Sequence, residues 1–535
     1  MPPRTANRPT NTHTFTGRDV PWLLRTQAVQ RANHPFLVWE PFEGEGRRWT
    51  YAEFARETGR VAAGMAARGI TAGDFVLIHL GNCPEFLLSW FACSQLGAIA
   101  VTTNTRSSLD ELRYFATHSG VVAAITQPEL LLGVREACPD ARWIACTETD
   151  QGAAPAATCP SRVLGFDELL ADGLAVPVRP AVPLAPNSVQ YTSGTTARPK
   201  GVVWTHANAL WGARMNASLL DLRGDDVTLA FLPLFHTNAL SYSMLATLWS
   251  GGTLVLQPKF SASRYWDAVI RNGCTWTTTI PFAAWALVKQ PRPGPHKMRF
   301  LGLGGSDVAL TKQLWNVRSI GWFGMTETIT LPIISEHGWP NREMAMGVPA
   351  PGYEIKVVRD DNSEVEFGES GQLKIRGIPG ISLFLEYLNN VEATDEAYDE
   401  EGWFCTGDLV TPFEDGHIRF DMRDKDMLRV GAENVAAAEV ERVVASLGGI
   451  SEVAVVAMPD KMLEEVPVAY VIPLMPDPTL PERILARCRE QLAPFKVPRH
   501  VFVVEDLPRV TLGKIDKKTL RQRLRESNTS EDSQT

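Results

Sequence analysis

FVLIHLGNCPEFLLSWFACSQLGAIAVTT, residues 75–103, places a helix-forming apolar run between two short apolar runs. Short apolar runs of this length are typical of strands buried on both faces, and residues 84–97 have the length of a crossover helix. The stretch therefore predicts a strand, a helix and a second strand in one parallel sheet.

The same alternation of short apolar runs and helical patterns continues on both sides of this stretch. A helical pattern at 51–69 precedes it, and the apolar run VVAAIT follows at 121–126. Further short apolar runs, VTLAFLPL, GTLVLQP, TWTTTIP and MRFLGLGG, begin at residues 227, 252, 275 and 298. We expect a large α/β domain of helix-covered, mainly parallel sheets.

The pattern changes after about Pro349. Short strands separated by turns at 353–377 indicate a small antiparallel, barrel-like subdomain. The block 424–525 mixes two helical patterns with apolar strands and predicts a smaller, mobile α+β domain. The predicted organisation is a tail at 1–20, an N-terminal domain at 21–423, a C-terminal domain at 424–525 and a polar tail at 526–535.

Composition favours a globular enzyme. Of 535 residues, 44% are hydrophobic and 21% charged, and the net charge of −9 argues against nucleic acid as the main partner. No apolar run is long enough to span a bilayer, and the eight cysteines stand singly, without metal-site spacing. The first residues are acid-poor, as transit peptides are, but contain prolines, so we expect a cytoplasmic protein with a loose tail.

The most informative motif is YTSGTTARPKGVVWTH, residues 191–206. A glycine at 194 lets the backbone approach phosphates, the hydroxyls of Ser193, Thr195 and Thr196 add donors, and Lys200 adds a compact positive charge. The P-loop pattern GxxxxGK[ST] is absent. From these residues alone, a phosphate loop and an ordinary Ser/Thr/Gly surface turn both remain open.

The motif as a whole resembles the phosphate-binding signature YTSGTTGxPKG of the adenylate-forming superfamily, which contains acyl-CoA synthetases, luciferases and peptide-synthetase adenylation domains. Five further segments resemble its other signatures in the family's order, so the resemblance covers residues 48–521. It implies ATP-dependent activation of a carboxylic acid, with Thr192 and the 193–200 loop binding ATP.

GWFGMTET, residues 321–328, resembles the family's aromatic-Gly-x-Thr-Glu motif. The resemblance implies that Phe323 and Gly324 contact adenine, Thr326 contacts the α-phosphate, and Glu327, with Thr195, binds Mg²⁺. A carboxylate beside a triphosphate needs such a cation. Taken alone, Glu327 also fits a charge at a helix N-terminus.

Three more segments carry implied nucleotide contacts. Gly304, Gly305 and Ser306 match the adenine-side loop, although a plain strand-to-helix turn needs the same glycines. Asp408, in Thr-Gly-Asp, matches the ribose-binding aspartate. In FDMRDKDMLRVGAENV, 420–435, Arg423 matches a ribose contact and Lys425 the hinge between the domains.

Lys514 follows Gly513 as in the family's C-terminal PxxxxGK motif, and is implied to neutralise charge between the carboxylate and the α-phosphate. The resemblance further implies that the C-terminal domain rotates about Lys425 and that CoA then takes the acyl group. Three departures stand out: Ala197 and Ala432 replace glycines, and Met422 replaces an aspartate. Ala432 lies in the loop that lines the pantetheine tunnel in relatives, which puts thioester formation in question.

FLPLFHTNAL, 231–240, resembles the segment beside the acyl site, where His236 gates the thiol. A core histidine under a loop is the alternative. The segments 192–203 and 259–281 are most similar to crotonobetaine/carnitine-CoA ligase-like members. Trp276, Thr278, Ile280 and Pro281 are expected to wall the acyl pocket, and their mixed polarity favours a short or polar acid.

The predicted protein is thus an AMP-forming acid:CoA ligase that uses ATP, Mg²⁺, coenzyme A and a small carboxylic acid. Two alternatives stay open. One is adenylation for another acceptor, such as a carrier protein or an amine, or of an oxyanion such as nitrite; the other is a nucleotide-binding regulatory protein. Integral membrane association is not expected, and a homodimer is left open.

Overall fold

The computed structural model describes residues 12–155, 163–173, 175–192, 198–303, 308–336, 338–339, 341–342, 344–423, 427–431, 433–509, 515–517 and 519–524, without the side chains of 281, 285, 308–310, 422 and 423. The chain forms two compact units. The larger comprises Met1–Thr105, Phe115–Tyr191 and Gly201–Met422, and the smaller Arg106–Tyr114, Thr192–Lys200 and Arg423–Thr535.

An eight-stranded sheet contains the stretch that predicted the fold class. Its strand order is β19-β9-β8-β4-β3-β5-β6-β7, and β8, β4, β3, β5, β6 and β7 run parallel. The strands are β3 (Phe75–His79), β4 (Ile99–Thr102), β5 (Ala123–Thr126), β6 (Ile144–Cys146), β7 (Leu164–Gly165), β8 (Pro186–Thr192), β9 (Lys200–Thr205) and β19 (Glu386–Tyr387). The predicted strand–helix–strand unit at 75–103 is confirmed.

The segments between the strands of this sheet contain helices and 3₁₀ turns. The helices are α2 (Tyr51–Ala67), which precedes β3, α3 (Pro84–Leu96), α4 (Leu109–Ser119) and α5 (Leu131–Ala137), and the 3₁₀ turns are η1 (Pro128–Leu130) and η2 (Phe166–Leu169). Helix α2 begins in a capping box: Thr50 Oγ1 accepts from the Glu53 amide (3.2 Å), and Glu53 Oε2 accepts from the Thr50 amide (2.8 Å). Helix α3 ends at Gly97, whose φ of 73° glycine tolerates best. Both helices match their predicted positions.

A nine-stranded sheet, in the order β16-β15-β14-β13-β12-β10-β11-β1-β2, carries the later motifs. Its strands are β1 (Pro35–Trp39), β2 (Arg47–Thr50), β10 (Val227–Ala230), β11 (Thr253–Leu256), β12 (Trp276–Thr278), β13 (Phe300–Leu303), β14 (Arg318–Phe323), β15 (Ile333–Ile334) and β16 (Val348–Pro349). The strands from β1 to β14 in this order are parallel, while β2, β15 and β16 pair antiparallel at the two edges. Because parallel strands point the same way, the loops after β10, β12, β13 and β14 leave from one edge of the sheet.

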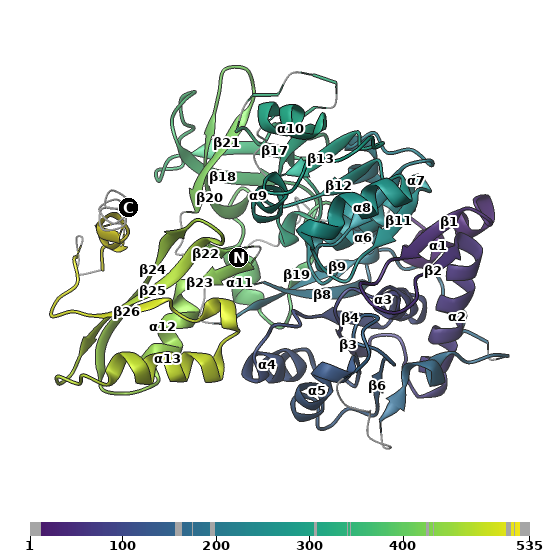
Figure 1. The fold of residues 1–535 in the computed structure, drawn as a ribbon, viewed down its shortest axis with the longest axis horizontal. Helices are drawn as coiled ribbons and strands as arrows, with labels where there is room; N and C mark the ends of the chain where they lie inside the picture. The colour runs from purple at the N-terminus through teal and green to yellow at the C-terminus, as the bar shows by residue number, and fades with distance from the viewer. Residues whose placement is uncertain are drawn as a thin grey trace. The chain divides into compact units, whose positions relative to one another are not determined.

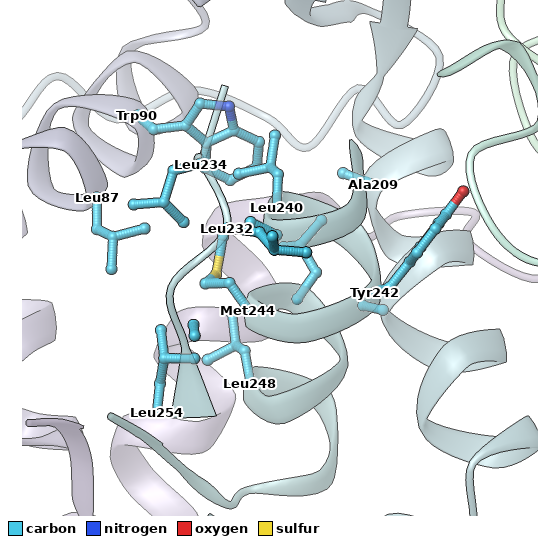
Figure 2. Close-up of a cluster of buried hydrophobic side chains, with 14 of the residues drawn as sticks. Leu87, Trp90, Ala209, Leu232, Leu234, Leu240, Tyr242, Met244, Leu248 and Leu254 are labelled. Atoms are coloured by element: carbon cyan, nitrogen blue, oxygen red, sulfur yellow. The ribbon is translucent and has the colours of Figure 1, made fainter. Parts of the chain in front are cut away.

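Helices of this part of the chain are α1 (Val20–Gln30), α6 (His206–Leu219), the π-helix η3 (Asn238–Leu245), α7 (Ala246–Ser250), α8 (Ala262–Asn272), α9 (Pro281–Val288), α10 (Val308–Trp315) and the 3₁₀ turn η4 (Thr326–Thr328). Helix η3 packs against β10 and β12. Figure 2 shows Leu240, Met244 and Leu248, from η3 and α7, turned toward a buried cluster with Leu87, Trp90 and Leu254, while Tyr242 projects away from it.

The predicted barrel-like subdomain is a four-stranded antiparallel sheet in the order β17-β18-β20-β21. It consists of β17 (Glu354–Val358), β18 (Gly371–Arg376), β20 (Phe404–Pro412) and β21 (Ile418–Arg423), with the helix α11 (Val391–Glu396) nearby in the sequence. The α/β class with an added antiparallel sheet is therefore as predicted.

The smaller unit contains the predicted α+β block. Strands β23, β22, β25 and β24 form a sheet in that order, and β26 joins β25 in parallel. Their bounds are β22 (Met427–Val430), β23 (Glu433–Ala436), β24 (Ile450–Asp460), β25 (Glu464–Pro473) and β26 (His500–Val503); the helices are α12 (Ala437–Ala445), α13 (Leu480–Gln491) and the 3₁₀ turn η5 (Pro494–Lys496). Helices α12 and α13 pack on each other beside this sheet (Figure 1).

The described residues contain neither a membrane-spanning helix nor a disulfide bond. None of their helices is long and apolar enough to cross a membrane. The seven cysteines among them are free thiols, and six are buried, as expected for small hydrophobic side chains.

Candidate active site

The segment Phe323–Thr328 leaves the carboxyl end of β14 and turns at once into η4. In open parallel sheets, ligands bind at the carboxyl ends of the strands. Phe323 is the last residue of β14 and is largely buried, whereas Thr326 is half-buried at the start of the turn. The motif predicted to contact the nucleotide thus lies at the edge of the sheet where this fold class places its ligands.

Glu327 is a buried carboxylate, with 5% of its surface exposed. Tyr387 Oη donates to its Oε1 at 2.9 Å, and its backbone oxygen accepts from the Phe384 amide at 2.8 Å. Tyr387 lies on β19, at the edge of the other sheet. A charged group this deep needs a cation or strong hydrogen bonds, and Tyr387 supplies one such bond.

Two phenols face this carboxylate. Burial, and then the charge of Glu327, raise the pKa of Tyr387 well above its usual range. Burial, followed by the same charge, also raises the pKa of Tyr242. Both side chains therefore stay protonated at physiological pH, and Tyr387 acts as a fixed hydrogen-bond donor to Glu327.

A hydrogen-bond chain joins three of the predicted motifs. Thr237 Oγ1 lies 3.2 Å from Thr326 Oγ1 and 3.1 Å from Gln190 Oε1, and Trp204 Nε1 donates to the backbone oxygen of Thr326 at 2.9 Å. Thr237 follows His236, and Gln190 precedes the 191–200 motif by one residue. The loop after β10, the end of β8 and the turn after β14 are therefore brought together.

The backbone around Glu327 is tightly constrained. A Cβ at Gly324 would overlap the Tyr242 hydroxyl and crowd the Thr330 backbone oxygen, so only glycine fits this motif position. Ile329, two residues after Glu327, has a φ of 66°, which is unfavourable for a β-branched side chain. Ser241 Oγ donates to the Ile329 oxygen at 2.7 Å and helps to hold this conformation. Backbone strain of this kind is commonly found at functional sites.

Of the predicted phosphate loop, the structure describes its two ends. Thr192 ends β8 and Lys200 begins β9, and both side chains are half-buried. Ser193, Gly194, Thr195, Thr196 and Ala197 lie outside the described residues, as do Gly304, Gly305 and Ser306 of the predicted adenine-side loop. Their nucleotide contacts stay predictions.

Asp408 lies on β20 and is almost fully buried, with its amide bonded to Thr406 Oγ1 at 3.1 Å. It belongs to the antiparallel sheet. Arg423 ends β21, but its side chain is not among those described, and Lys425, Ala432 and Lys514 lie outside the described residues. The hinge role of Lys425 and the catalytic role of Lys514 therefore stay predictions.

His236 is half-buried, and its ring packs on Phe235 with 4.5 Å between centroids. Of the predicted pocket walls, Thr278 ends β12, where its Oγ1 is 2.8 Å from Ser243 Oγ of η3. Trp276 is fully buried and stacks on Phe300, so it belongs to the core beneath this edge. Ile280 is half-buried and precedes α9; the Pro281 side chain is not described.

Four contacting residues were missed by the sequence reasoning: Gln190, Trp204, Thr237 and Tyr387. Gln190 directly precedes the 191–206 motif, Trp204 lies inside it, and Thr237 lies inside the 231–240 segment, so the motifs were a usable signal for these three. Tyr387 is 60 residues from Glu327 along the chain. No local pattern connects the two.

A buried carboxylate and a neighbouring threonine hydroxyl at the carboxyl end of a parallel strand are typical of a ligand-binding edge in this fold class. The AMP-binding enzyme family model matches residues 24–388, and the AMP-binding enzyme C-terminal domain model matches 439–514. The chain belongs to the AMP-binding enzyme family, as an acid:CoA ligase of the AMP-forming type.

Its curated relatives agree with this assignment. The crotonobetaine/carnitine–CoA ligase of Proteus mirabilis strain HI4320 is 32% identical over 505 residues, which cover 91% of this chain and 95% of that protein. The enzyme of the same name from Salmonella paratyphi C strain RKS4594 is 33% identical over 498 residues, with the same coverage. The resemblance to ligases of this kind is confirmed at the level of the family.

Solved structures share the fold. A double mutant of the o-succinylbenzoate CoA synthetase of Bacillus subtilis, bound to a product analogue, has a TM-score of 0.79 and 26% identity, covering 94% of this chain and 98% of that one. An anthranilate CoA ligase in complex with anthranoyl-AMP has a TM-score of 0.69 and 25% identity, covering 96% and 98%.

Proposed function

We propose that the enzyme activates a small carboxylic acid with ATP, releases pyrophosphate, and transfers the acyl group from the acyl-adenylate to coenzyme A. The observation that carries the proposal is the contact network around Thr326 and Glu327. It places a hydroxyl and a fixed carboxylate together where ligands bind in this fold class. The carnitine-type ligases among its relatives act on acids, which supports the same substrate class.

The residues present fit Mg²⁺ bound with ATP. Mg²⁺ in nucleotide enzymes is held by one or two carboxylates together with substrate phosphates, and Glu327 offers one such carboxylate, its second oxygen already fixed by Tyr387. Thr195 is the second proposed ligand. When bound, the ion would neutralise charge on the phosphates.

The side chains of the protein would contribute to the reaction by positioning the substrates and screening their charge. A carboxylic acid is ionised at neutral pH and attacks the α-phosphorus without a general base, so alignment and charge screening limit the rate. We propose that Thr326 contacts the α-phosphate, Asp408 and Arg423 hold the ribose, and Lys200 and Lys514 supply positive charge. His236 then stands beside the path of the thiol.

We also propose the domain organisation expected from the sequence: residues 424–525 form a mobile domain that turns about Lys425. Turning would exchange Lys514 for the loop at 431–434, in which Gly431 has a φ of 65°. In this scheme one chain uses ATP and coenzyme A in succession.

ATP/pyrophosphate exchange tests the proposal. Purified enzyme is supplied with ATP, Mg²⁺ and a panel of short carboxylic acids, including quaternary-ammonium acids, with nitrite added as a separate substrate. The products with and without CoA are then identified by mass spectrometry. Acid-dependent exchange with a CoA thioester is expected; exchange without thioester would assign another acceptor, and absence of exchange would contradict the proposal.

A further inference from the structure

A tight turn centred on Ile329 follows Glu327 directly. Ile329 has a φ of 66° and a ψ of −42°, and the Thr330 amide donates to the Thr328 oxygen at 2.6 Å. These dihedrals, with a hydrogen bond between residues two apart, define the γ-turn with positive φ, which is the rare and strained form. Ile329 is β-branched and fully buried, so the contacts around it must hold the turn in place.

Asn216 of α6 connects two residues that act on this turn. Its Nδ2 donates to Ser241 Oγ at 3.1 Å, and its Oδ1 accepts from Thr330 Oγ1. Ser241 Oγ in turn donates to the Ile329 oxygen at 2.7 Å. The side chains of Asn216, Ser241 and Thr330 are fully buried and satisfy one another, and we refer to these three residues as the turn network.

Helix α6 approaches the turn closely because residue 212 is a glycine. Gly212 precedes Asn216 by four residues and therefore lies on the same face of α6. A Cβ at Gly212 would overlap Ser241 Oγ and crowd the Ile329 side chain. A glycine inside a helix lowers its stability, and here it makes room for the contact of α6 with the turn.

Tyr353 supplies a further contact to the turn. Its hydroxyl lies 2.7 Å from the Thr328 oxygen and 3.1 Å from Nε1 of Trp211, the residue of α6 that precedes Gly212. Burial raises the pKa of Tyr353 well above its usual range, so the phenol keeps its proton at physiological pH. Helix α6 thus reaches the turn through several of its residues.

The π-helix η3 contacts the motif on both sides of Glu327. Thr237, which precedes η3, bonds Thr326 at 3.2 Å, and Ser241 within η3 bonds the oxygen of Ile329. π-Helices are rare and frequently lie at functional sites. The backbone that carries Glu327 is therefore held at the residue before it and again two residues after it.

We propose that Asn216 and Ser241 are positioning residues for the reaction. They hold the γ-turn at Ile329 and so fix the backbone from which Glu327 projects. This inference rests on the proposed function, in which Glu327 binds Mg²⁺. Breaking the turn network lets Ile329 relax toward a negative φ, which shifts the carboxylate and weakens the binding of the ion.

The test introduces Ser241→Ala into the wild type and into an Ile329→Gly variant. In the wild type, we expect the Mg²⁺ concentration for half-maximal ATP/pyrophosphate exchange to rise by ~10-fold or more, because the turn loses its hydrogen bond. Glycine adopts a positive φ without strain. In the Ile329→Gly variant, Ser241→Ala should therefore change the Mg²⁺ dependence by no more than ~2-fold.

Ser94→Ala is the matched control. Ser94 Oγ also donates to a buried asparagine, Asn187, at 2.7 Å, but at the start of β8 and so at the opposite end of that strand from the phosphate loop. Ser94→Ala removes a bond of the same kind and should leave the Mg²⁺ dependence unchanged.

A second readout needs neither ATP nor Mg²⁺. Amide hydrogen exchange of the ligand-free enzyme, followed by mass spectrometry on the peptide 321–332, should be ~10-fold faster at the turn in Ser241→Ala, because the Thr330 amide opens more often. Ser94→Ala should match the wild type. Thermal melting checks that each variant folds. If Ser241→Ala does not fold, Thr330→Val replaces it, since valine keeps the shape of the side chain and breaks the bond to Asn216.

An unchanged Mg²⁺ dependence in folded Ser241→Ala would overturn the positioning role. A loss of equal size in the Ile329→Gly variant, or in Ser94→Ala, would overturn it as well. Absence of ATP/pyrophosphate exchange by the wild type with any acid would contradict the proposed function. Hydrogen exchange separates the two failures, because a rate at the turn that is equal in Ser241→Ala and wild type overturns the inference whatever the activity.

Discussion

The carboxyl ends of β3–β5 and of β12–β14 are both edges of parallel strands, but different polar groups lie at the two edges. At the end of β3, His79 Nδ1 lies 2.8 Å from Thr103 Oγ1, and Thr126 Oγ1 donates to the His79 oxygen at 3.1 Å. These polar groups are fully buried and satisfy one another. Burial lowers the pKa of His79 to about 4, so it is neutral at physiological pH.

At the end of β14 polar groups instead surround Glu327, a buried carboxylate that accepts a hydrogen bond from Tyr387. Hydrogen bonds from elements far apart in the sequence hold it and its neighbour Thr326 in place, and the backbone beside them is strained at Ile329. The comparison teaches that the same strand–helix repeat gives a closed, self-satisfied edge at β3–β5 and, at β14, an edge with a buried carboxylate, which is the candidate site.

The largest difference between the two edges should appear on removing that charge. Glu327→Gln is expected to lower ATP/pyrophosphate exchange by ~100-fold or more, because Glu327 is the proposed Mg²⁺ ligand and a bound metal ion contributes several kcal/mol of charge stabilisation. Glu396→Gln, on the exposed surface of α11, is the control. Wild-type exchange rates in Glu327→Gln would show that the carboxylate plays no part.

Tyr387→Phe removes one hydrogen bond to Glu327 and keeps the ring. We expect the Mg²⁺ concentration for half-maximal exchange to rise by ~10-fold, as for other residues that orient a metal ligand. Tyr265→Phe is the control, since its hydroxyl has no hydrogen-bond partner among the described residues. An equal Mg²⁺ dependence in both variants would mean that Tyr387 does not position the carboxylate.

Thr237→Val breaks the link between Gln190 and Thr326. The expected result is a decrease in kcat of ~5-fold with little change in the KM for ATP, because one neutral hydrogen bond is worth about 1 kcal/mol. Thr58→Val, in α2, removes a buried hydroxyl without a partner among the described residues and should leave kcat intact. A rise in KM at constant kcat would assign Thr237 to binding alone.

The smallest effect on activity is expected at the closed edge, where the prediction concerns stability. The pKa of His79 is about 4 in the folded protein and about 6.5 in the unfolded chain. As the pH falls, the unfolded chain therefore binds the proton first, and the free energy of unfolding decreases between about pH 6.5 and pH 4. His79→Gln should reduce this dependence by up to ~1.4 kcal/mol per pH unit. Denaturant midpoints between pH 4 and 8 measure it, with His500→Gln, an exposed histidine, as control. Parallel curves for wild type and His79→Gln would contradict the assignment.

These two edges also show what could be predicted from the sequence. The strands β3, β4 and β5 were predictable because buried parallel strands are short apolar runs, which local patterns record. Phe323, Thr326 and Glu327 were found through a contiguous motif. The contact of Tyr387 with Glu327 depends on strand order and register, which no window of sequence contains.

The most direct test is a crystal structure with a non-hydrolysable acyl-adenylate analogue, such as the sulfamoyl adenosine ester of a short acid. We predict that the phosphate mimic lies within hydrogen-bond distance of Thr326 Oγ1. An analogue bound at the ends of β3–β5 would contradict the placement of the reaction at β12–β14.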